Sequence, residues 1–187
     1  MKVLFIVPEI RLDSTPDNMP FWAGILAAIV ENNGGQVGIL DLNALRMKYD
    51  GRQVPTKVIS EEISSEKWDL IGIGGLTTTY SRIKELCPLI KKCSPDSLLI
   101  SGGGWASYNP DEILQLVPEL DLICIGEGEE TFSEIYDEME HGTKDFEKVN
   151  GLCLRDGKGC KFTGPRGLIS DLNTVPYPAY DLYELDI

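Results

Sequence analysis

The sequence predicts an α/β fold in which a doubly wound, five-stranded parallel sheet carries helices on both faces and is followed by a C-terminal β-hairpin and an irregular strap. Short apolar runs alternate along the chain with longer amphipathic segments, which is the pattern of a parallel sheet covered on both sides. Glycine and proline stand at the ends of several of these segments, where they favour boundaries. With 187 residues, of which 42% are hydrophobic and 25% charged, the chain is long enough to bury one core.

Each element of this fold has a local signal. The strands are expected at five short apolar runs, residues 3–7, 36–41, 70–74, 98–101 and 122–125. The helices are expected at amphipathic segments that cover residues 21–33, 60–67, 81–92, a stretch from 111, and 129–140. Gly34 and Gly35 end the first helix, where a left-handed cap costs least, and Pro110 marks the start of the fourth. For this β/α repeat we expect a Rossmann-like sheet with the strand order 2-1-3-4-5.

The chain changes character after Gly142, and we divide it there into an α/β domain, residues 1–142, and a C-terminal segment, residues 143–187. Residues 151–163 predict a β-hairpin around an Asp-Gly turn, which we expect to be an appendage to the sheet. Residues 171–187 contain three tyrosines and two prolines without a helical or strand period, so they are expected to form a strap or linker. The chain is therefore expected to be a fragment of a larger protein.

The negative charge of the chain is concentrated in one stretch. Lys and Arg number 17 and Asp and Glu 30, which gives a formal net charge of -13 at pH 7. Residues 93–143 contain no Lys or Arg and twelve acidic side chains. Such a surface repels a phosphate backbone, so we expect no nucleic-acid partner; the stretch is expected to be a solvated acidic face or, alternatively, a surface for a basic partner. No apolar run reaches the roughly 18 residues that span a bilayer, and the N-terminal run is too short for a signal peptide, so we expect a cytoplasmic protein without membrane contact.

The cysteines and the single histidine carry no recognisable catalytic or metal pattern. The five cysteines include no CxxC pair, so their spacing indicates neither a zinc site nor an iron–sulfur site. Cys153 and Cys160 could face each other across the hairpin, but we expect two ordinary thiols. His141 stands at the end of an acidic helix, where a surface role is expected. We therefore predict no catalytic residue and no protein ligand to a metal.

Ligands of a doubly wound sheet bind beyond the carboxyl ends of its strands, which directs attention to four loops. The loop of residues 8–20 is long for a strand-to-helix connection and carries Glu9, so it is expected to be functional. The loops of residues 72–80, 101–107 and 126–131 are rich in glycine, which lets a backbone approach a bulky ligand closely. The alternative to ligand binding, for any one loop, is a structural role in which glycine relieves crowding where the strand meets the helix.

The glycine-rich loops do not match the known nucleotide-binding motifs. In segments 72–77 and 126–131 the third glycine of the dinucleotide fingerprint is replaced by threonine, and neither segment follows the first strand. The chain has no GxxxxGK[ST] motif, and the first loop lacks the hydroxyl-rich phosphate cradle of a flavodoxin-like flavin site. A flavin or nucleotide binder is therefore disfavoured.

Several segments of the chain match one known pattern, namely residues 20–31, 72–80, 101–107 with 110–114, 121–129 and 171–182. The Gly-Glu-Gly-Glu step that begins at Gly126 and the Pro-Ala-Tyr-Asp-Leu sequence that begins at Pro178 are the most specific. Together these segments resemble the cobalamin-binding domain at the N-terminal side of cobalamin-dependent radical S-adenosylmethionine (radical SAM) enzymes. The resemblance covers nearly the whole chain.

In that family of Fe-S oxidoreductase-like enzymes, the segment after this domain leads into a radical core, where a CxxxCxxC motif holds a [4Fe-4S] cluster and S-adenosylmethionine is cleaved. This sequence ends before any such motif. The resemblance implies that the cofactor is cobalamin and that the partner is the radical core of the same parent chain. It also implies that the fragment alone is not catalytic.

The resemblance further implies a cofactor geometry, in which the corrin ring lies across the carboxyl end of the sheet and the nucleotide tail enters a cleft between elements. Carried over by position, Thr77, Thr78 and Thr79 would line the tail. The glycines after the fourth strand would let the tail pass and the loop after the fifth strand would close the other side, and these residues are Gly102, Gly103, Gly104, Gly126, Glu127 and Gly128. Glu9 and Trp105 complete the predicted cofactor-binding set.

Two positions depart from related cobalamin domains. Domains of the methionine synthase type carry DxHxxG after the first strand, where the histidine ligates cobalt, whereas residues 9–14 here contain no histidine. Many relatives have histidine near Trp105, and this tryptophan could pack on the ring or fill the core. We therefore expect base-off cobalamin without a histidine ligand from the first loop, presented for methyl transfer or radical rearrangement. The alternative is a degenerate, cofactor-free docking or substrate-recognition module of the same type of enzyme.

Overall fold

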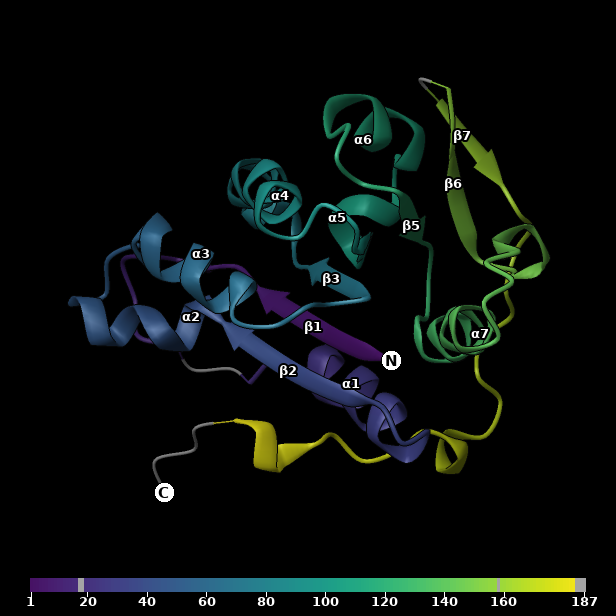
Figure 1. Cartoon of the computed structure of the whole chain (residues 1–187), viewed down its shortest axis with the longest axis horizontal. Coiled ribbons are helices and arrows are strands. Elements are labelled where there is room, and N and C mark those ends of the chain that lie inside the picture. Colours follow the sequence, from purple (N-terminus) through teal and green to yellow (C-terminus); the bar gives the residue numbers. More distant parts are fainter. Residues whose placement is uncertain (17–18, 158, 184–187) are drawn as a thin grey trace.

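A seven-stranded mixed sheet with helices on both faces forms the centre of the molecule (Figure 1). The computed structural model describes residues 1–16, 19–157 and 159–183. Its strands are β1 (Lys2–Val7), β2 (Gln36–Asp41), β3 (Leu70–Gly74), β4 (Leu98–Gly102), β5 (Leu122–Cys124), β6 (Leu152–Asp156) and β7 (Gly159–Phe162). They lie in the order β2-β1-β3-β4-β5-β6-β7. The predicted α/β class with helices on both faces is confirmed.

The helices of the described residues follow the predicted β/α alternation. They are α1 (Phe21–Asn32), α2 (Leu42–Leu45), α3 (Thr56–Ser64), α4 (Tyr80–Cys93), α5 (Gly104–Ser107), α6 (Pro110–Leu116) and α7 (Glu129–Glu140). Short 3₁₀ turns cover Arg46–Tyr49, Thr77–Thr79, Phe146–Lys148, Leu172–Thr174 and Tyr180–Leu182. The second predicted helix, α3, begins and ends earlier along the chain than expected. It starts directly after Pro55 and ends before the buried Trp68.

Side chains of the central strands alternate between two apolar layers. On one face, Phe5 and Ile100 pack in the same layer as Ala27 of α1 and Phe132 of α7. On the other face, the layer contains residues from α3, α4 and α6, and Figure 1 shows these helices on the side of the sheet away from α1 and α7. Parallel strands that are buried on both faces produce the continuous apolar runs seen in the sequence.

The hairpin is part of the sheet, so its description as an appendage is wrong. β6 pairs antiparallel with β5, with Cys124 opposite Leu152, and β7 then pairs with β6. The unpaired N–H and C=O groups at the outer edge of β5 are thereby satisfied. Local sequence shows that a hairpin forms, but it does not show which strand edge the hairpin joins.

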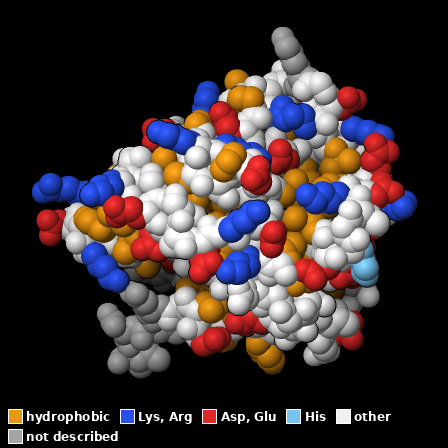
Figure 2. All heavy atoms as spheres, viewed as in Figure 1, with side chains coloured by type: hydrophobic (Ala, Val, Ile, Leu, Met, Phe, Trp, Pro, Cys, Tyr) orange, Lys and Arg blue, Asp and Glu red, His pale blue; other side chains and the backbone are white. Residues whose placement is uncertain are grey.

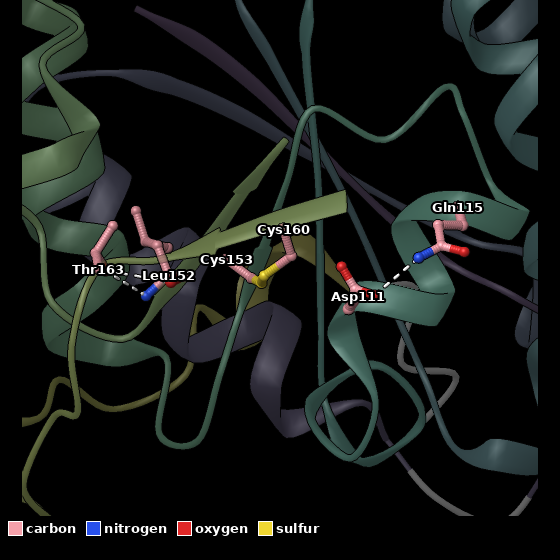
Figure 3. The surroundings of a disulfide bond; sticks show 6 residues. All are labelled: Asp111, Gln115, Leu152, Cys153, Cys160 and Thr163. Atoms are coloured by element: carbon pink, nitrogen blue, oxygen red, sulfur yellow. Dashed lines mark hydrogen bonds between the residues drawn. A yellow bond between two sulfur atoms is a disulfide. The ribbon is translucent and has the colours of Figure 1, made fainter. Parts of the chain in front are cut away.

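The expectation of two ordinary thiols is also wrong, because Cys153 and Cys160 form a disulfide (Figure 3). The register places Cys153 opposite Phe162 and Cys160 opposite Arg155, so both cysteines point to the same face of the hairpin. Their Cα atoms are 5.5 Å apart, within the range that a disulfide spans. Asp111 and Gln115 of α6 lie beside the hairpin, as Figure 3 shows.

The strap predicted after the hairpin lies against α1. The Ala179 amide donates to the Gly24 carbonyl (3.0 Å), and the Tyr183 hydroxyl donates to the Pro20 carbonyl (2.8 Å). A Cβ on Gly24 would lie 2.8 Å from Cβ of Pro178, so the close approach of strap and helix requires glycine. Residues 184–187 of the predicted strap lie outside the described residues.

The acidic stretch is balanced in part by positive groups from elsewhere in the chain. Arg166 pairs with Glu134 (2.7 Å) and Glu130 (3.3 Å), and the amino group of Met1 pairs with Glu140 (2.6 Å). Figure 2 shows acidic and basic side chains interspersed on one face of the molecule.

Within residues 1–16, 19–157 and 159–183, no helix has the length and apolar character needed to cross a membrane.

Candidate cofactor-binding site

A cavity of about 510 Å³ lies at the carboxyl edge of the sheet, between the sheet, α1 and α7. Its lining comes from the ends of β1, β3, β4 and β5, from the first half of α1 and from the start of α7. In a doubly wound sheet this is the edge where ligands bind. The volume falls within the range of small-molecule sites.

The floor of the cavity is backbone, because the strands present glycine there. Gly72 pairs with Ile100, and Gly74 pairs with Gly102, all on the face that carries α1 and α7. A Cβ on Gly72 would lie 2.7 Å from the Phe5 ring, and a Cβ on Gly74 would lie 3.3 Å from the ring of Trp22. The rings of Phe5 and Trp22 therefore occupy the space that side chains at Gly72 and Gly74 would need, and the glycines let both cavity-lining rings lie close to the strand.

Aromatic and aliphatic side chains form the walls. Trp22 and Leu26 come from α1, and Phe132 and Ile135 come from α7. The Phe5 ring lies between the two helices, with its centroid 6.0 Å from that of Trp22 and 5.4 Å from that of Phe132. Such a chamber favours a flat, apolar group over a charged one.

The few polar groups of the lining lie toward its edges. Asp41 caps α2 by accepting from the amides of Asn43 and Ala44, and burial raises the pKa of its carboxyl above the ordinary value despite these bonds. Burial raises the pKa of the Cys124 thiol to about 11, so this side chain is neutral at pH 7. One carboxylate oxygen of Glu129 is buried and accepts no hydrogen bond from the described residues. That oxygen is available to a ligand N–H.

The end of β4 and the loops after β4 and β5 contribute six of the predicted cofactor-binding residues to the lining of the cavity. Gly102, Gly103, Gly104, Gly126, Glu127 and Gly128 all line it. Gly103 (φ 84°) and Gly126 (φ 81°) lie in the left-handed region, which favours glycine. The Glu127 carboxylate also accepts from the backbone amide of Ile169, which lies between β7 and the strap (2.7 Å). These loops bring backbone amides from two strands to one edge of the sheet.

The predicted threonines lie beside the cavity and do not line it. Thr77, Thr78 and Thr79 form a 3₁₀ turn that follows the cavity residue Leu76. The Thr79 hydroxyl is buried and donates to the Leu76 carbonyl (2.7 Å), whereas Thr77 and Thr78 are exposed.

Glu9 and Trp105 also lie outside the lining. The Glu9 carboxylate is buried in an ion pair with Arg82 (2.7 Å). Trp105 lies in the core on the α4 face, with its ring centroid 5.9 Å from that of Tyr80, and its Nε1 has no partner among the described residues.

The apolar walls were not found from the sequence. Phe5, Trp22 and Phe132 follow the same strand and helix periods as ordinary core residues, so no local pattern separates a cavity wall from a packed interior. Gly72 and Gly74 were the sequence signal that could have indicated the cavity, because glycine inside a buried strand often marks a close approach of another group. Both lie on the face of β3 that α1 and α7 cover.

The fold and this glycine-floored, apolar cavity define a ligand-binding α/β domain of the doubly wound class. The chain belongs to the B12 binding domain family, whose model matches residues 10–136. No group of three or more His, Cys, Asp or Glu side chains that could hold a metal ion occurs among the described residues.

Curated relatives are longer proteins. An uncharacterized methyltransferase of Pyrococcus horikoshii, PH0819, is 26% identical over 190 residues, which cover 100% of this chain and 39% of the relative. Cytidylyl-2-hydroxyethylphosphonate methyltransferase of Streptomyces wedmorensis is 25% identical over 220 residues, which cover 99% of this chain and 41% of the relative. The chain thus spans about two fifths of these proteins.

Solved structures share the fold. The cobalamin-dependent S-adenosylmethionine radical enzyme OxsB, with aqua-cobalamin and S-adenosylmethionine bound, matches with a TM-score of 0.79 and 19% identity over 97% of this chain and 24% of that one. The radical S-adenosylmethionine methyltransferase TsrM from Kitasatospora setae, with cobalamin and a [4Fe-4S] cluster bound, matches with a TM-score of 0.73 and 18% identity over 94% of this chain and 31% of that one.

Proposed function

We propose that this domain binds cobalamin base-off, with the nucleotide tail in the cavity between the sheet, α1 and α7 and the corrin ring across the carboxyl edge. The observation that carries the proposal is the apolar, glycine-floored cavity that opens among the loops of residues 102–104 and 126–128. In the parent protein the domain presents this cofactor to a radical SAM core for methyl transfer or radical rearrangement.

The residues present fit such a ligand. A flat aromatic base needs depth and apolar walls, which Phe5, Trp22 and Phe132 provide. The amide-bearing periphery of the cofactor needs hydrogen-bond partners, and the unpaired oxygen of Glu129 supplies an acceptor. Bound cobalamin supplies the organometallic chemistry, while this chain binds and orients it and excludes water.

The position of the only histidine supports the absence of histidine ligation. His141 follows the last turn of α7, and the neighbouring Glu140 pairs with the amino group of Met1 at the start of β1. That end of α7 therefore lies at the amino edge of the sheet, opposite the cavity loops. The loop after β1 offers no histidine either, because residues 9–14 contain none.

The proposed partner is a radical core of the same parent chain, with its own [4Fe-4S] cluster and S-adenosylmethionine. Relatives of greater length include methyltransferases, which supports this assignment. We propose that residues 143–187 connect the domain, residues 1–142, to that core, although their hairpin belongs to the same sheet.

The proposal is tested by corrin retention. The chain is mixed with hydroxocobalamin and desalted, and the visible spectrum of the protein fraction is recorded. Gly102→Val places a branched side chain on the cavity floor, where a Cβ has contacts no closer than 3.4 Å, and is expected to abolish retention without unfolding the chain. Gly167→Val, between β7 and the strap at a position with no atom within 4 Å of the added Cβ, is the matched control and should retain corrin.

Two results would contradict the proposal. If the folded wild-type chain retains no corrin, cobalamin binding is refuted and the cofactor-free docking or recognition module becomes the better explanation. If the cobalt(II) form shows nitrogen superhyperfine coupling in its EPR spectrum, a nitrogen ligand is present and the base-off, histidine-free state is refuted.

A further inference from the structure

Glu129 brings an unpaired hydrogen-bond acceptor into a largely apolar cavity. It is the second glutamate of the Gly-Glu-Gly-Glu step and the first residue of α7, and it belongs to the cavity lining. Its Oε2 atom is buried and accepts no hydrogen bond from residues 1–16, 19–157 and 159–183. Buried polar atoms are nearly always paired in native proteins, so this oxygen calls for an explanation.

The neighbouring carboxylates of the same segment are paired. Glu127 accepts from the Ile169 amide (2.7 Å), and Glu130 forms an ion pair with Arg166 (3.3 Å). Consecutive residues of a helix point in different directions, so Glu130 meets Arg166 and does not line the cavity, whereas Glu129 does. The unpaired oxygen of Glu129 is therefore not a general property of this acidic segment.

Glu129 lies at the mouth of the cavity, above its apolar wall. Glu129, Phe132 and Ile135 recur every three residues on one face of α7, and all of them line the cavity. Because α7 follows β5, its first residue lies at the carboxyl edge of the sheet, about 4.5 Å farther along the helix axis than Phe132. A ligand whose flat end reaches Phe132 therefore passes the Glu129 carboxylate.

The lining does not supply the donor that this oxygen lacks, as far as the described part of the chain goes. The Ser101 hydroxyl donates to the Ile73 carbonyl (2.6 Å), and Asp41 is itself an acceptor that caps α2. A buried carboxylate oxygen favours an N–H donor on the ligand and disfavours a second negative charge, and both effects are stronger away from bulk water. A primary amide offers two such donors, whereas an ionised carboxylate offers none.

We propose that Glu129 is a specificity-determining residue, whose Oε2 accepts an N–H of a primary amide at the edge of the corrin ring. The site thereby selects an amidated corrinoid over one that carries a carboxylate at the same position. This inference rests on the proposed cobalamin binding and names the chemical feature of the cofactor that the cavity recognises. Selection of this kind combines a favourable contact to one ligand with repulsion of the other.

The test measures a ratio of affinities within each protein. Equilibrium dialysis gives the Kd of the full chain for hydroxocobalamin and for each of its separated monocarboxylic acids, in which one primary amide of the ring edge is hydrolysed. Wild type is expected to bind at least one of these acids about 10- to 100-fold more weakly than hydroxocobalamin, because a hydrogen bond is lost and two like charges meet. Circular dichroism reports the folding of every protein used.

Glu129→Gln is the decisive variant, and Glu130→Gln is its matched control. Glutamine has the same shape as glutamate but carries N–H donors that can bind the carboxylate of the acid, so Glu129→Gln should reduce the ratio for that acid to about threefold or less. Glu130→Gln removes the same charge from the adjacent residue, which pairs with Arg166 and does not line the cavity, and should keep the wild-type ratio.

A second measurement uses the wild-type chain alone and separates the hydrogen bond from the charge. The discriminated acid is converted to its N-methylamide, which keeps one N–H, and to its N,N-dimethylamide, which has none; both are neutral. Loss of the donor opposite a buried acceptor should make the dimethylamide bind about 10-fold more weakly than the methylamide. This measurement stays informative if Glu129→Gln does not fold.

The outcomes separate this inference from the proposed function. If wild type retains no corrin, cobalamin binding itself fails. If wild type retains hydroxocobalamin but binds every monocarboxylic acid equally well, the cofactor binds and selection of the amide is overturned. If Glu129→Gln discriminates as strongly as wild type, the amide is selected by another group and the assignment to Glu129 is overturned.

Discussion

Replacing Arg82 by methionine is expected to destabilise the fold strongly, because it leaves the buried Glu9 carboxylate without its cationic partner. The side chains of Glu9 and Arg82 are 1% and 13% exposed, and they are joined by bonds of 2.7 and 3.0 Å. Burial alone lowers the pKa of Arg82, but the hydrogen bond and charge of Glu9 outweigh it and raise the pKa above its ordinary value.

The magnitude follows from what remains after the change. In Arg82→Met the aliphatic packing is largely kept, and of the bonds that Glu9 accepts from the described residues, the one from the Val54 amide (3.0 Å) remains. Removal of one partner of a buried pair costs about 3–5 kcal/mol. Because Arg82 lies near the surface and water can replace part of its charge, we expect the lower end, about 3 kcal/mol.

The assay is urea unfolding followed by circular dichroism. Lys57→Met is the matched control, because Lys57 and Glu61 form an exposed pair at 3.7 Å whose loss should cost about 0–1 kcal/mol. The double variant Glu9→Gln with Arg82→Met should recover about 1 kcal/mol or more relative to Arg82→Met, since no buried charge remains. An effect of Arg82→Met as small as that of Lys57→Met would refute the reasoning.

Three further predictions concern the cysteines and the strap. Reduction of the disulfide between Cys153 and Cys160 should lower the free energy of unfolding by about 2.5 kcal/mol through the entropy of the short loop it closes, and an unchanged urea midpoint under reductant would contradict this. Because burial raises the pKa of Cys124 to about 11, its alkylation by iodoacetamide should be slow at pH 8 and rise about tenfold per pH unit toward that value, as mass spectrometry can check. Burial and the charge of Asp41 raise the pKa of Tyr183 to about 12, whereas an unfolded phenol titrates near 10. The contribution of Tyr183 to stability is therefore complete below about pH 10 and lost as pH rises toward 12; Tyr183→Phe should remove this pH dependence of urea unfolding, and an equal dependence in both proteins would contradict the prediction.

Much of the fold was predictable because its signals are local. The apolar run at residues 70–74 is β3, and the run at 98–101 is β4 apart from its last residue. Parallel strands end at one edge of a sheet, so the sequence also placed the glycine-rich loops together, and residues 102–104 and 126–128 do share one cavity. Periodicity and turn residues suffice for such features, because each depends on neighbours along the chain.

The functional meaning of single polar residues was less predictable. Glu9 lies in a ligand-side loop and reads as a cofactor contact, but its partner Arg82 lies 73 positions away and directs it elsewhere. Trp105 follows a glycine-rich strand end, yet its ring lies in the core beside Tyr80. Both outcomes depend on contacts between distant segments, which no local pattern encodes.

The sequence by itself determined the α/β class, most of the strands and helices, and the edge at which the glycine-rich loops gather, because hydrophobic period and glycine position act over a few residues. Only the tertiary structure decided that the hairpin completes the sheet, that two cysteines pair across it, and that a cavity exists beneath the loops. The cavity is bounded by Phe5 and Trp22, from β1 and α1, and by Phe132, from the distant helix α7. Its volume is set by how closely those elements pack over a floor of glycine, and packing distance is a property of the assembled fold.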